Sequence, residues 1–319
     1  MHCIPNLNYI GDHLPSDIEI ERLNHTFQGG VKVEFGRLIT AMVTPFDEQG
    51  NIDWEQTAKL IDYLIDEQKS DALVVCGTTG ESPTISDEEK LQLFDFAVKH
   101  TSGRCRIIAG TGSNNTAHSI HLTAEAEKLG VDGVLLVVPY YSKPSQEGLY
   151  RHFEAIATST KLPVMLYNVP GRTVISMNTE TILRLAQISN ITSIKECAAL
   201  DQVAQVANLA PEGFRVYTGD DAAGLPALAV GAYGIVSVAS HLIGEPMKQM
   251  VQAHLEGQVA EAAKLHQQLL PVFKGLFECP NPVAVKFALN ERGVKVGSVR
   301  LPLVPPSEEE AVSIRKLFD

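Results

Sequence analysis

Eight short runs of apolar and β-branched residues alternate with longer segments of helical period between residues 38 and 238. The runs are apolar throughout, which is typical of parallel strands covered by helices on both faces. Helices are the usual connections between parallel strands, so the alternation predicts β–α units. We expect strands at 38–44, 72–76, 106–109, 133–139, 163–167, 191–195, 215–218 and 234–238.

The segments between these runs carry helix-start signals, such as Ser86 ahead of Glu89 and Asn178 ahead of Glu180. Eight β–α units are the number that closes a (β/α)8 TIM barrel, and no G-x-G-x-x-G follows a strand to favour a doubly wound open sheet. We expect helices at 54–69, 86–100, 115–129, 146–158, 179–188 and 201–209, and further helices at 246–256, 259–277, 283–292 and 307–318.

This pattern predicts an α/β chain with three parts. Residues 1–34 read as a polar N-terminal extension, residues 35–257 as the barrel that carries the chemistry, and residues 258–319 as a C-terminal helical appendage.

The charge balance constrains the partners. Lys and Arg total 26 against 38 Asp and Glu, which gives a net charge of −12, and no basic run interrupts the acidic excess. Such a surface repels nucleic acid and anionic lipid, so neither is expected as a partner. The five cysteines are scattered without a C-x-x-C pair, and neither a signal peptide nor an 18-residue apolar stretch is present. We therefore expect a cytoplasmic protein with reduced thiols.

Lys195 lies in the apolar run Ile-Thr-Ser-Ile-Lys-Glu. A buried ammonium either pairs with a carboxylate, here the neighbouring Glu196, or loses its proton and becomes an amine nucleophile. Polar residues that follow other runs favour the second interpretation. They are Gly-Thr-Thr-Gly-Glu at 77–81, Pro-Tyr-Tyr at 139–141, Tyr-Asn-Val-Pro-Gly-Arg-Thr at 167–173 and Thr-Gly-Asp-Asp at 218–221. In a barrel these strand ends meet at one face, where active sites lie.

In this order and spacing, the motifs resemble those of the dihydrodipicolinate synthase and N-acetylneuraminate lyase superfamily of lysine-dependent, pyruvate-handling barrels. The resemblance extends from about residue 35 to the C-terminus. Its Tyr-Asn-Val-Pro-Gly-Arg-Thr turn points to the synthase branch. This resemblance implies the condensation of pyruvate with aspartate semialdehyde, in the diaminopimelate route of lysine biosynthesis.

The resemblance also assigns catalytic roles. Lys195 would form a Schiff base with pyruvate, whose nitrogen acts as an electron sink. Tyr167 would transfer protons near the imine, linked to Thr78 and to a Tyr141 that reaches in from a neighbouring subunit.

The substrate-binding residues follow from the same resemblance. Thr79 and amides of its loop would hold the pyruvate carboxylate. Arg172 would bind the carboxylate of the second substrate as a bidentate clamp. Gly219 and Val236 would line the pocket.

The implied assembly is a homotetramer built as a dimer of dimers, with small molecules as the only other partners. No cofactor is implied beyond the covalent Lys195–pyruvate adduct, and no metal. His118 and His121 stand three residues apart on a predicted helix, but they lack a third ligand for zinc.

Two further functions stay open at this stage. A related barrel cleaves longer sugar acids such as N-acetylneuraminate or 2-keto-3-deoxygluconate, and a barrel without catalysis could sense a keto acid. Arg172 favours the short semialdehyde over a polyol.

Feedback by lysine is only partly supported. Ser82, Asn114 and Tyr140 match the family's regulatory pocket, whereas Asp87, Lys90 and His118 depart from the residues of lysine-inhibited members.

Overall fold

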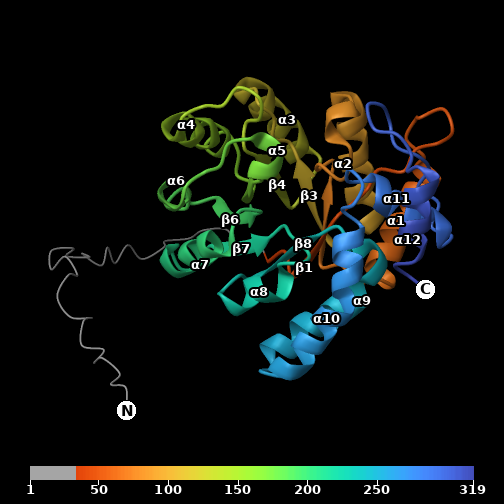
Figure 1. Cartoon of the computed structure of the whole chain (residues 1–319). Coiled ribbons are helices and arrows are strands. Elements are labelled where there is room, and N and C mark those ends of the chain that lie inside the picture. The colour runs from red at the N-terminus through yellow and green to blue at the C-terminus, as the bar shows by residue number, and fades with distance from the viewer. Residues whose placement is uncertain (1–33) are drawn as a thin grey trace, which may run out of the picture. The chain divides into compact units, whose positions relative to one another are not determined.

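Eight parallel strands close into a barrel in the computed structural model, which describes residues 34–319 (Figure 1). Each strand pairs with its neighbour in the sequence, and β1 closes the ring by pairing with β8. The predicted (β/α)8 TIM barrel is therefore confirmed. The strands are β1 Leu38–Ala41, β2 Ala72–Val75, β3 Arg106–Gly110, β4 Gly133–Val137, β5 Val164–Asn168, β6 Ile191–Glu196, β7 Arg215–Thr218 and β8 Gly234–Ser237.

Helices follow the strands and surround the barrel (Figure 1). Ser86 and Glu89 form the capping box that the sequence indicated, and Asn178 caps its helix by accepting from the amide of Thr181. The helices of the barrel are α1 Trp54–Asp66, α2 Asp87–Thr101, α3 Thr116–Lys128, α4 Gln146–Ala157, α5 Pro170–Thr173, α6 Thr179–Leu185, α7 Leu200–Leu209 and α8 Gly224–Ala229, with a 3-10 turn η1 at Ser82–Thr84.

The sequence prediction erred where the chain leaves the sheet. The predicted strands 38–44 and 133–139 are too long, since β1 ends at Ala41 and β4 at Val137. Pro139 has no N–H to give to a neighbouring strand, and the residues beyond these ends build the face of the barrel instead. The short helices α5 and α8 were not predicted, because six or fewer residues show no helical period.

Two hydrophobic layers stabilise the fold. One fills the barrel and includes Ile39, Val74, Ile108, Met165 and Val236. The other lies between the strands and the surrounding helices. Successive residues of a strand point alternately into these two layers, so each strand can carry one side chain toward the interior and the next toward a helix.

The last four helices lie together along one side of the barrel, with α11 and α12 at the right of Figure 1 and α9 and α10 below them. They are α9 Ser240–Leu255, α10 Val259–Gly275, α11 Val283–Glu291 and α12 Glu308–Arg315. α9 packs on β1, α10 packs on α9, and α11 contacts both α9 and α12. The predicted C-terminal helices are confirmed. The helix expected at 246 begins earlier, at Ser240, and is kinked at Ile243 just before Pro246.

The predicted extension of residues 1–34 lies, except for Glu34, outside the described residues. The boundary predicted between residues 257 and 258 falls in the turn between α9 and α10, and a division into two domains there stays a prediction. Across residues 34–319, no helix combines the length and the apolar character that a membrane span requires. The four cysteines in this range are free thiols.

Candidate active site

Lys195 and Tyr167 lie side by side in the barrel wall. The register of β5 and β6 pairs Tyr167 with Lys195, and both side chains enter the interior at the carboxyl ends of their strands. The Lys195 Nζ lies 4.5 Å from the centroid of the Tyr167 ring. Only 6% of Lys195 is exposed, and no ion pair or hydrogen bond to its ammonium is found among residues 34–319. The sheet thus holds a buried amine against a phenol.

Glu196 is not the partner of Lys195, so the alternative of an ion pair within the strand is wrong. Because successive strand residues point to opposite faces, Glu196 faces the helices while Lys195 faces the interior. Its carboxylate accepts from Asn168 Nδ2 at 2.9 Å, from Gln202 Nε2 at 3.1 Å and from the amide of Ala198 at 2.8 Å. Burial raises the pKa of Glu196, and these hydrogen bonds oppose that rise.

Tyr167 keeps its proton at neutral pH. Burial raises the pKa of Tyr167 above its usual value, while the Lys195 charge and a hydrogen bond with Thr78 act in the opposite direction. A phenol of this kind can donate a proton to a neighbouring group and take one back. Thr78 lines the same cavity as Tyr167, as the sequence analysis expected of a linked pair.

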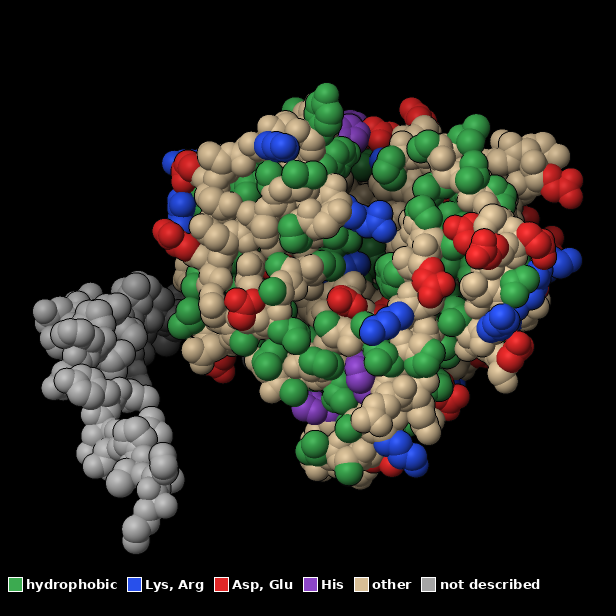
Figure 2. All heavy atoms as spheres, in the orientation of Figure 1, with side chains coloured by type: hydrophobic (Ala, Val, Ile, Leu, Met, Phe, Trp, Pro, Cys, Tyr) green, Lys and Arg blue, Asp and Glu red, His purple; other side chains and the backbone are tan. Residues whose placement is uncertain are grey.

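The cavity beside these residues measures about 530 Å³. Thr78, Tyr167 and Arg172 line it, whereas Lys195 and Thr79 are not among its lining residues. Arg172 is exposed on α5, and none of its atoms lies within ion-pair distance of a carboxylate in the described part of the chain. Figure 2 shows one face of the molecule hollowed near its centre, with Lys or Arg side chains at the edge of the hollow. A free guanidinium at such an opening suits an anionic ligand.

Gly219 follows β7 and is required by close packing. A Cβ atom at this position would lie 2.5 Å from Lys195 Cε and 2.4 Å from Cys197 Sγ. Gly219 therefore leaves space for the lysine side chain. Val236 on β8 is buried in the interior layer together with Tyr167. Of the two predicted lining residues, Gly219 therefore lies against the lysine, while neither Gly219 nor Val236 is among the residues that line the 530 Å³ cavity.

Tyr141 is not brought to this cavity by its own chain. Tyr141 is 91% exposed and its backbone has the left-handed φ of +70°. The neighbouring Tyr140 lines the cavity instead. An exposed tyrosine held in a rarely populated backbone conformation fits the expectation of a contact outside its own subunit.

The sequence analysis missed residues from the C-terminal helices that hold the Gly77–Glu81 loop. Asn281 donates to the Thr79 hydroxyl at 2.8 Å, and Lys286 pairs with Glu81 at 3.0 Å. The backbone of Glu81 has a φ of +59°, unusual for a residue other than glycine. More than 200 residues separate the two sides of these contacts, so no local pattern could have revealed them.

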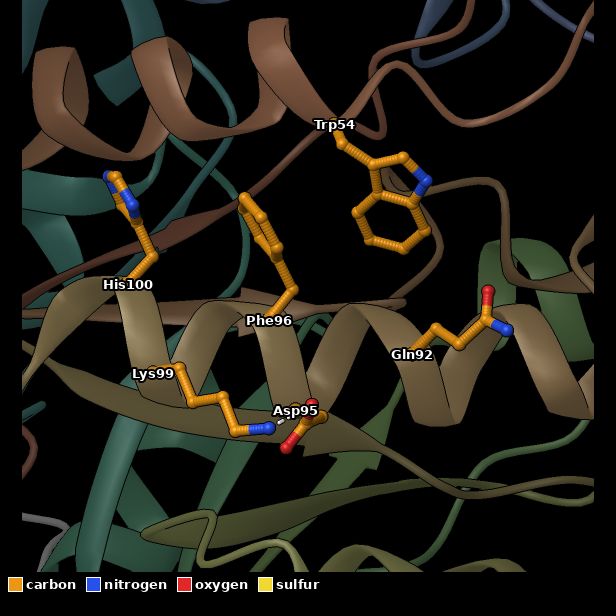
Figure 3. A pocket seen from close by; sticks show the side chains of 6 residues that line it. All are labelled: Trp54, Gln92, Asp95, Phe96, Lys99 and His100. Atoms are coloured by element: carbon orange, nitrogen blue, oxygen red, sulfur yellow. Dashed lines mark hydrogen bonds and ion pairs between the residues drawn. The ribbon is translucent and has the colours of Figure 1, made fainter.

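A second cavity of about 540 Å³ lies outside the barrel, between α1 and α2 (Figure 3). Trp54, Phe96 and His100 line it, and an ion pair joins Lys99 to Asp95 at 2.7 Å. None of the predicted site residues borders this cavity.

The surroundings of His118 bear on the zinc site that the pair His118 and His121 could have suggested. His118 lies 2.7 Å from Asp87 and 3.1 Å from Ser113 Oγ. Residues 34–319 contain no group of three His, Cys, Asp or Glu side chains arranged to hold a metal ion.

The fold and these residues define the class of the protein: TIM-barrel enzymes whose site lies at the carboxyl ends of the strands. Within that class, the chain belongs to the dihydrodipicolinate synthetase family, whose model matches residues 34–319.

Similar proteins agree with this assignment. The chain is 58% identical over 284 residues to a 4-hydroxy-tetrahydrodipicolinate synthase of Bacillus velezensis, covering 89% of this chain and 98% of that protein. A crystal structure of a dihydrodipicolinate synthase from Bacillus anthracis superposes with a TM-score of 0.88 at 52% identity, covering 89% and 98% of the two chains. A structure of the enzyme from Cyanidioschyzon merolae with lysine bound gives a TM-score of 0.87 at 43% identity, covering 89% and 97%.

Proposed function

We propose that this protein condenses pyruvate with L-aspartate 4-semialdehyde to 4-hydroxy-tetrahydrodipicolinate, in the diaminopimelate route of lysine biosynthesis. The observation that carries the proposal is a buried lysine that, within residues 34–319, has no carboxylate partner and lies beside a protonated tyrosine. Membership of the family and the names of its similar members support the same reaction.

The reaction begins at the Lys195 amine, which attacks the C2 carbonyl of pyruvate. Loss of water leaves a protonated Schiff base, whose nitrogen withdraws electrons and lets a C3 proton leave. The resulting enamine forms a C–C bond from C3 to the aldehyde carbon of the semialdehyde. The amino group of the semialdehyde then attacks C2 and displaces Lys195, which closes the ring.

Two side chains serve the protons and charges of these steps. The Tyr167 ring centroid lies 4.5 Å from the amine, and Tyr167 protonates the leaving water and accepts protons in return, with Thr78 beside it in the cavity lining. Arg172, free of carboxylates in the described chain and exposed at the cavity, binds the semialdehyde carboxylate. The Schiff base itself is the electron sink, so the proposed reaction uses neither a metal nor another cofactor.

The pyruvate carboxylate is assigned to Thr79 and the amides of its loop. Thr79 is 3% exposed and lies on the loop whose Gly77 and Thr78 border the cavity. Gly219 and Val236 complete the lining on the side of β7 and β8.

The assembly proposed is a homotetramer arranged as a dimer of dimers, in which Tyr141 completes the site of a neighbouring subunit. Its 91% exposed ring supports this arrangement, because a large aromatic side chain in water is costly. A cytoplasmic location is proposed with it, supported by the four free thiols of the described chain.

Borohydride reduction tests the nucleophile directly. The full-length protein is incubated with pyruvate, reduced, digested and mapped by mass spectrometry. The peptide that contains Ile194 and Lys195 should gain the mass of a reduced pyruvate adduct, while the same peptide from Lys195→Arg should not. An unaltered mass for this peptide in the parent would refute the proposal.

The choice of second substrate is tested separately. The parent should consume aspartate semialdehyde with pyruvate, and it should leave N-acetylneuraminate and 2-keto-3-deoxygluconate intact. Cleavage of a sugar acid without condensation would overturn the choice of substrate, and binding of pyruvate without either reaction would favour a sensor.

A further inference from the structure

The loop assigned to the pyruvate carboxylate is fixed by residues from the C-terminal part of the chain, on and beside α11. Asn281, just before α11, donates from its Nδ2 to the Thr79 Oγ1 at 2.8 Å, and the two residues are 8% and 3% exposed. Lys286 on α11 holds the carboxylate of Glu81 at the end of the same loop. The amide of Arg300 donates to the other Glu81 oxygen at 2.9 Å. The position of Thr79 therefore depends on a segment 202 residues away.

The direction of the Asn281 hydrogen bond determines where the Thr79 proton can go. An amide NH2 group can only donate, so the Thr79 oxygen accepts, and a hydroxyl has one proton of its own to give. Within residues 34–319, the Thr79 hydroxyl has no other hydrogen-bond partner. A buried hydroxyl proton without an acceptor is unfavourable unless a ligand supplies one.

We propose that Asn281 is a positioning residue for the keto-acid carboxylate: by donating to Thr79 Oγ1 it directs the Thr79 proton to the ligand. This inference rests on the proposed function, which assigns the pyruvate carboxylate to Thr79. The hydrogen bond from Thr79 to a carboxylate is charge-assisted, which makes it shorter and stronger than one between neutral groups. The C-terminal helices thus contribute to substrate affinity through a side chain that need not touch the substrate.

The nearly isosteric substitution Asn281→Leu tests the proposal through the direction in which the KM for pyruvate changes. Without the donor, the Thr79 proton can turn away from the ligand, so the KM for pyruvate should rise about tenfold while kcat at saturating pyruvate changes little. With the opposite amide orientation, in which Asn281 Oδ1 accepts the Thr79 proton, the substitution would free that proton and lower the KM. An unchanged or lowered KM overturns the proposal.

The matched control is Asn290→Leu. Asn290 lies on α11, the helix that Asn281 precedes, and its side-chain amide bonds the backbone, donating to Gly297 O and accepting from Val296 N. Its loss should lower the melting temperature and leave the KM for pyruvate unchanged. An equal rise of KM in both variants would show a general effect of loosening this helix and would contradict the specific role of Asn281.

A double-mutant cycle with Thr79→Val keeps the inference testable if one variant is unstable. In the Thr79→Val background, Asn281→Leu should cause no further rise of KM, because the proton that it directs is gone. Independent, additive effects would overturn the proposal. Borohydride labelling of the parent with pyruvate distinguishes failure of this inference from failure of the proposed reaction. If Lys195 is labelled but Asn281→Leu has no effect on the KM, only the role of Asn281 is refuted. If the parent is not labelled, the proposed reaction itself is refuted.

Discussion

Two buried lysines in different regions of the molecule show what distinguishes a reactive side chain from a structural one. Lys195 on β6 inside the barrel is 6% exposed, and Lys286 on α11 is 1% exposed. The Lys286 ammonium donates to Glu81 Oε1 at 3.0 Å, to Thr44 O at 2.9 Å and to Ser298 O at 2.5 Å. These acceptors use all three of its protons. Among residues 34–319, no acceptor lies within hydrogen-bond distance of the Lys195 ammonium, whose Nζ is 4.5 Å from the centroid of the Tyr167 ring.

Burial of a lysine therefore does not by itself indicate a reactive amine. A buried lysine whose ammonium has no hydrogen-bond acceptor does indicate one. Burial lowers the pKa of Lys286, and the charge of Glu81 opposes this, yet an amine surrounded by three acceptors cannot attack a substrate. The arginines repeat the contrast. Arg300 binds both oxygens of Glu89, whereas Arg172 at the cavity is bound to no carboxylate among the described residues. Lys195 and Arg172, which pair with no carboxylate among residues 34–319, are the side chains that we assign to the substrates.

The largest effect is expected from Lys195→Met. Turnover should fall by at least about a thousandfold, because the nucleophile is removed. The free energy of unfolding should stay level or rise, since a buried amine that has no hydrogen-bond partner among the described residues is replaced by an apolar side chain of similar size. Steady-state kinetics and denaturant unfolding measure the two quantities. Retained turnover, or a large loss of stability, would break the contrast between the lysines.

Lys286→Met should show the reverse pattern. It leaves the Glu81 carboxylate buried and unpaired, so the free energy of unfolding should fall by about 3–5 kcal/mol. Borohydride with pyruvate should still label Lys195 in the protein that remains folded. Adding Glu81→Gln in the same chain should restore part of the stability, because the unpaired charge is removed. Stability equal to that of the parent in Lys286→Met would contradict a structural role for this lysine.

A smaller effect is expected from Arg172→Lys, which keeps the charge and removes the fork of two parallel N–H groups. The KM for aspartate semialdehyde should rise about tenfold to a hundredfold. Labelling of Lys195 by pyruvate should be unaffected, because Arg172 serves the second substrate. Kinetics with each substrate varied in turn measure this. A rise confined to the KM for pyruvate would reassign the arginine.

Much of the fold could be predicted because its signals are local. A strand such as β7, predicted at 215–218, needs only a run of apolar residues, and a helix such as α2 begins at a capping box that four residues define. The barrel followed from the number of β–α units. Prediction failed for α8, whose six residues are too few to show a period, and at the carboxyl end of β4.

The candidate site divides in the same way. Lys195 and Tyr167 stand at the ends of predicted strands, so their proximity follows from the topology of the barrel. Asn281 and Lys286 could not be linked to the loop, since the packing of α11 on that face depends on tertiary contacts across more than 200 residues. The register of β6, which separates Lys195 from Glu196, also decided between two interpretations that the sequence left open.

Lys90 is intermediate between Lys195, which has no acceptor among the described residues, and Lys286, which has three. Its side chain is 11% exposed at the edge of the cavity, and its ammonium lies 3.7 Å from Asp87, whose other oxygen is 2.7 Å from His118. This loosely paired cation should repel the ammonium groups of L-lysine, while His118 occupies the nearby carboxylate. Millimolar L-lysine should therefore leave the turnover of the parent unchanged.

Lys90→Met combined with His118→Glu should make the enzyme sensitive to L-lysine, since it removes a cation and adds an acceptor for one. The matched control is Lys99→Met on the same helix, where Lys99 pairs with Asp95 at 2.7 Å on the outside of the barrel (Figure 3). That variant should stay as insensitive as the parent. Initial rates measured against L-lysine concentration give the comparison. Inhibition of the parent as strong as that of the double variant would show that a loosely paired ammonium at this cavity does not exclude a cationic ligand.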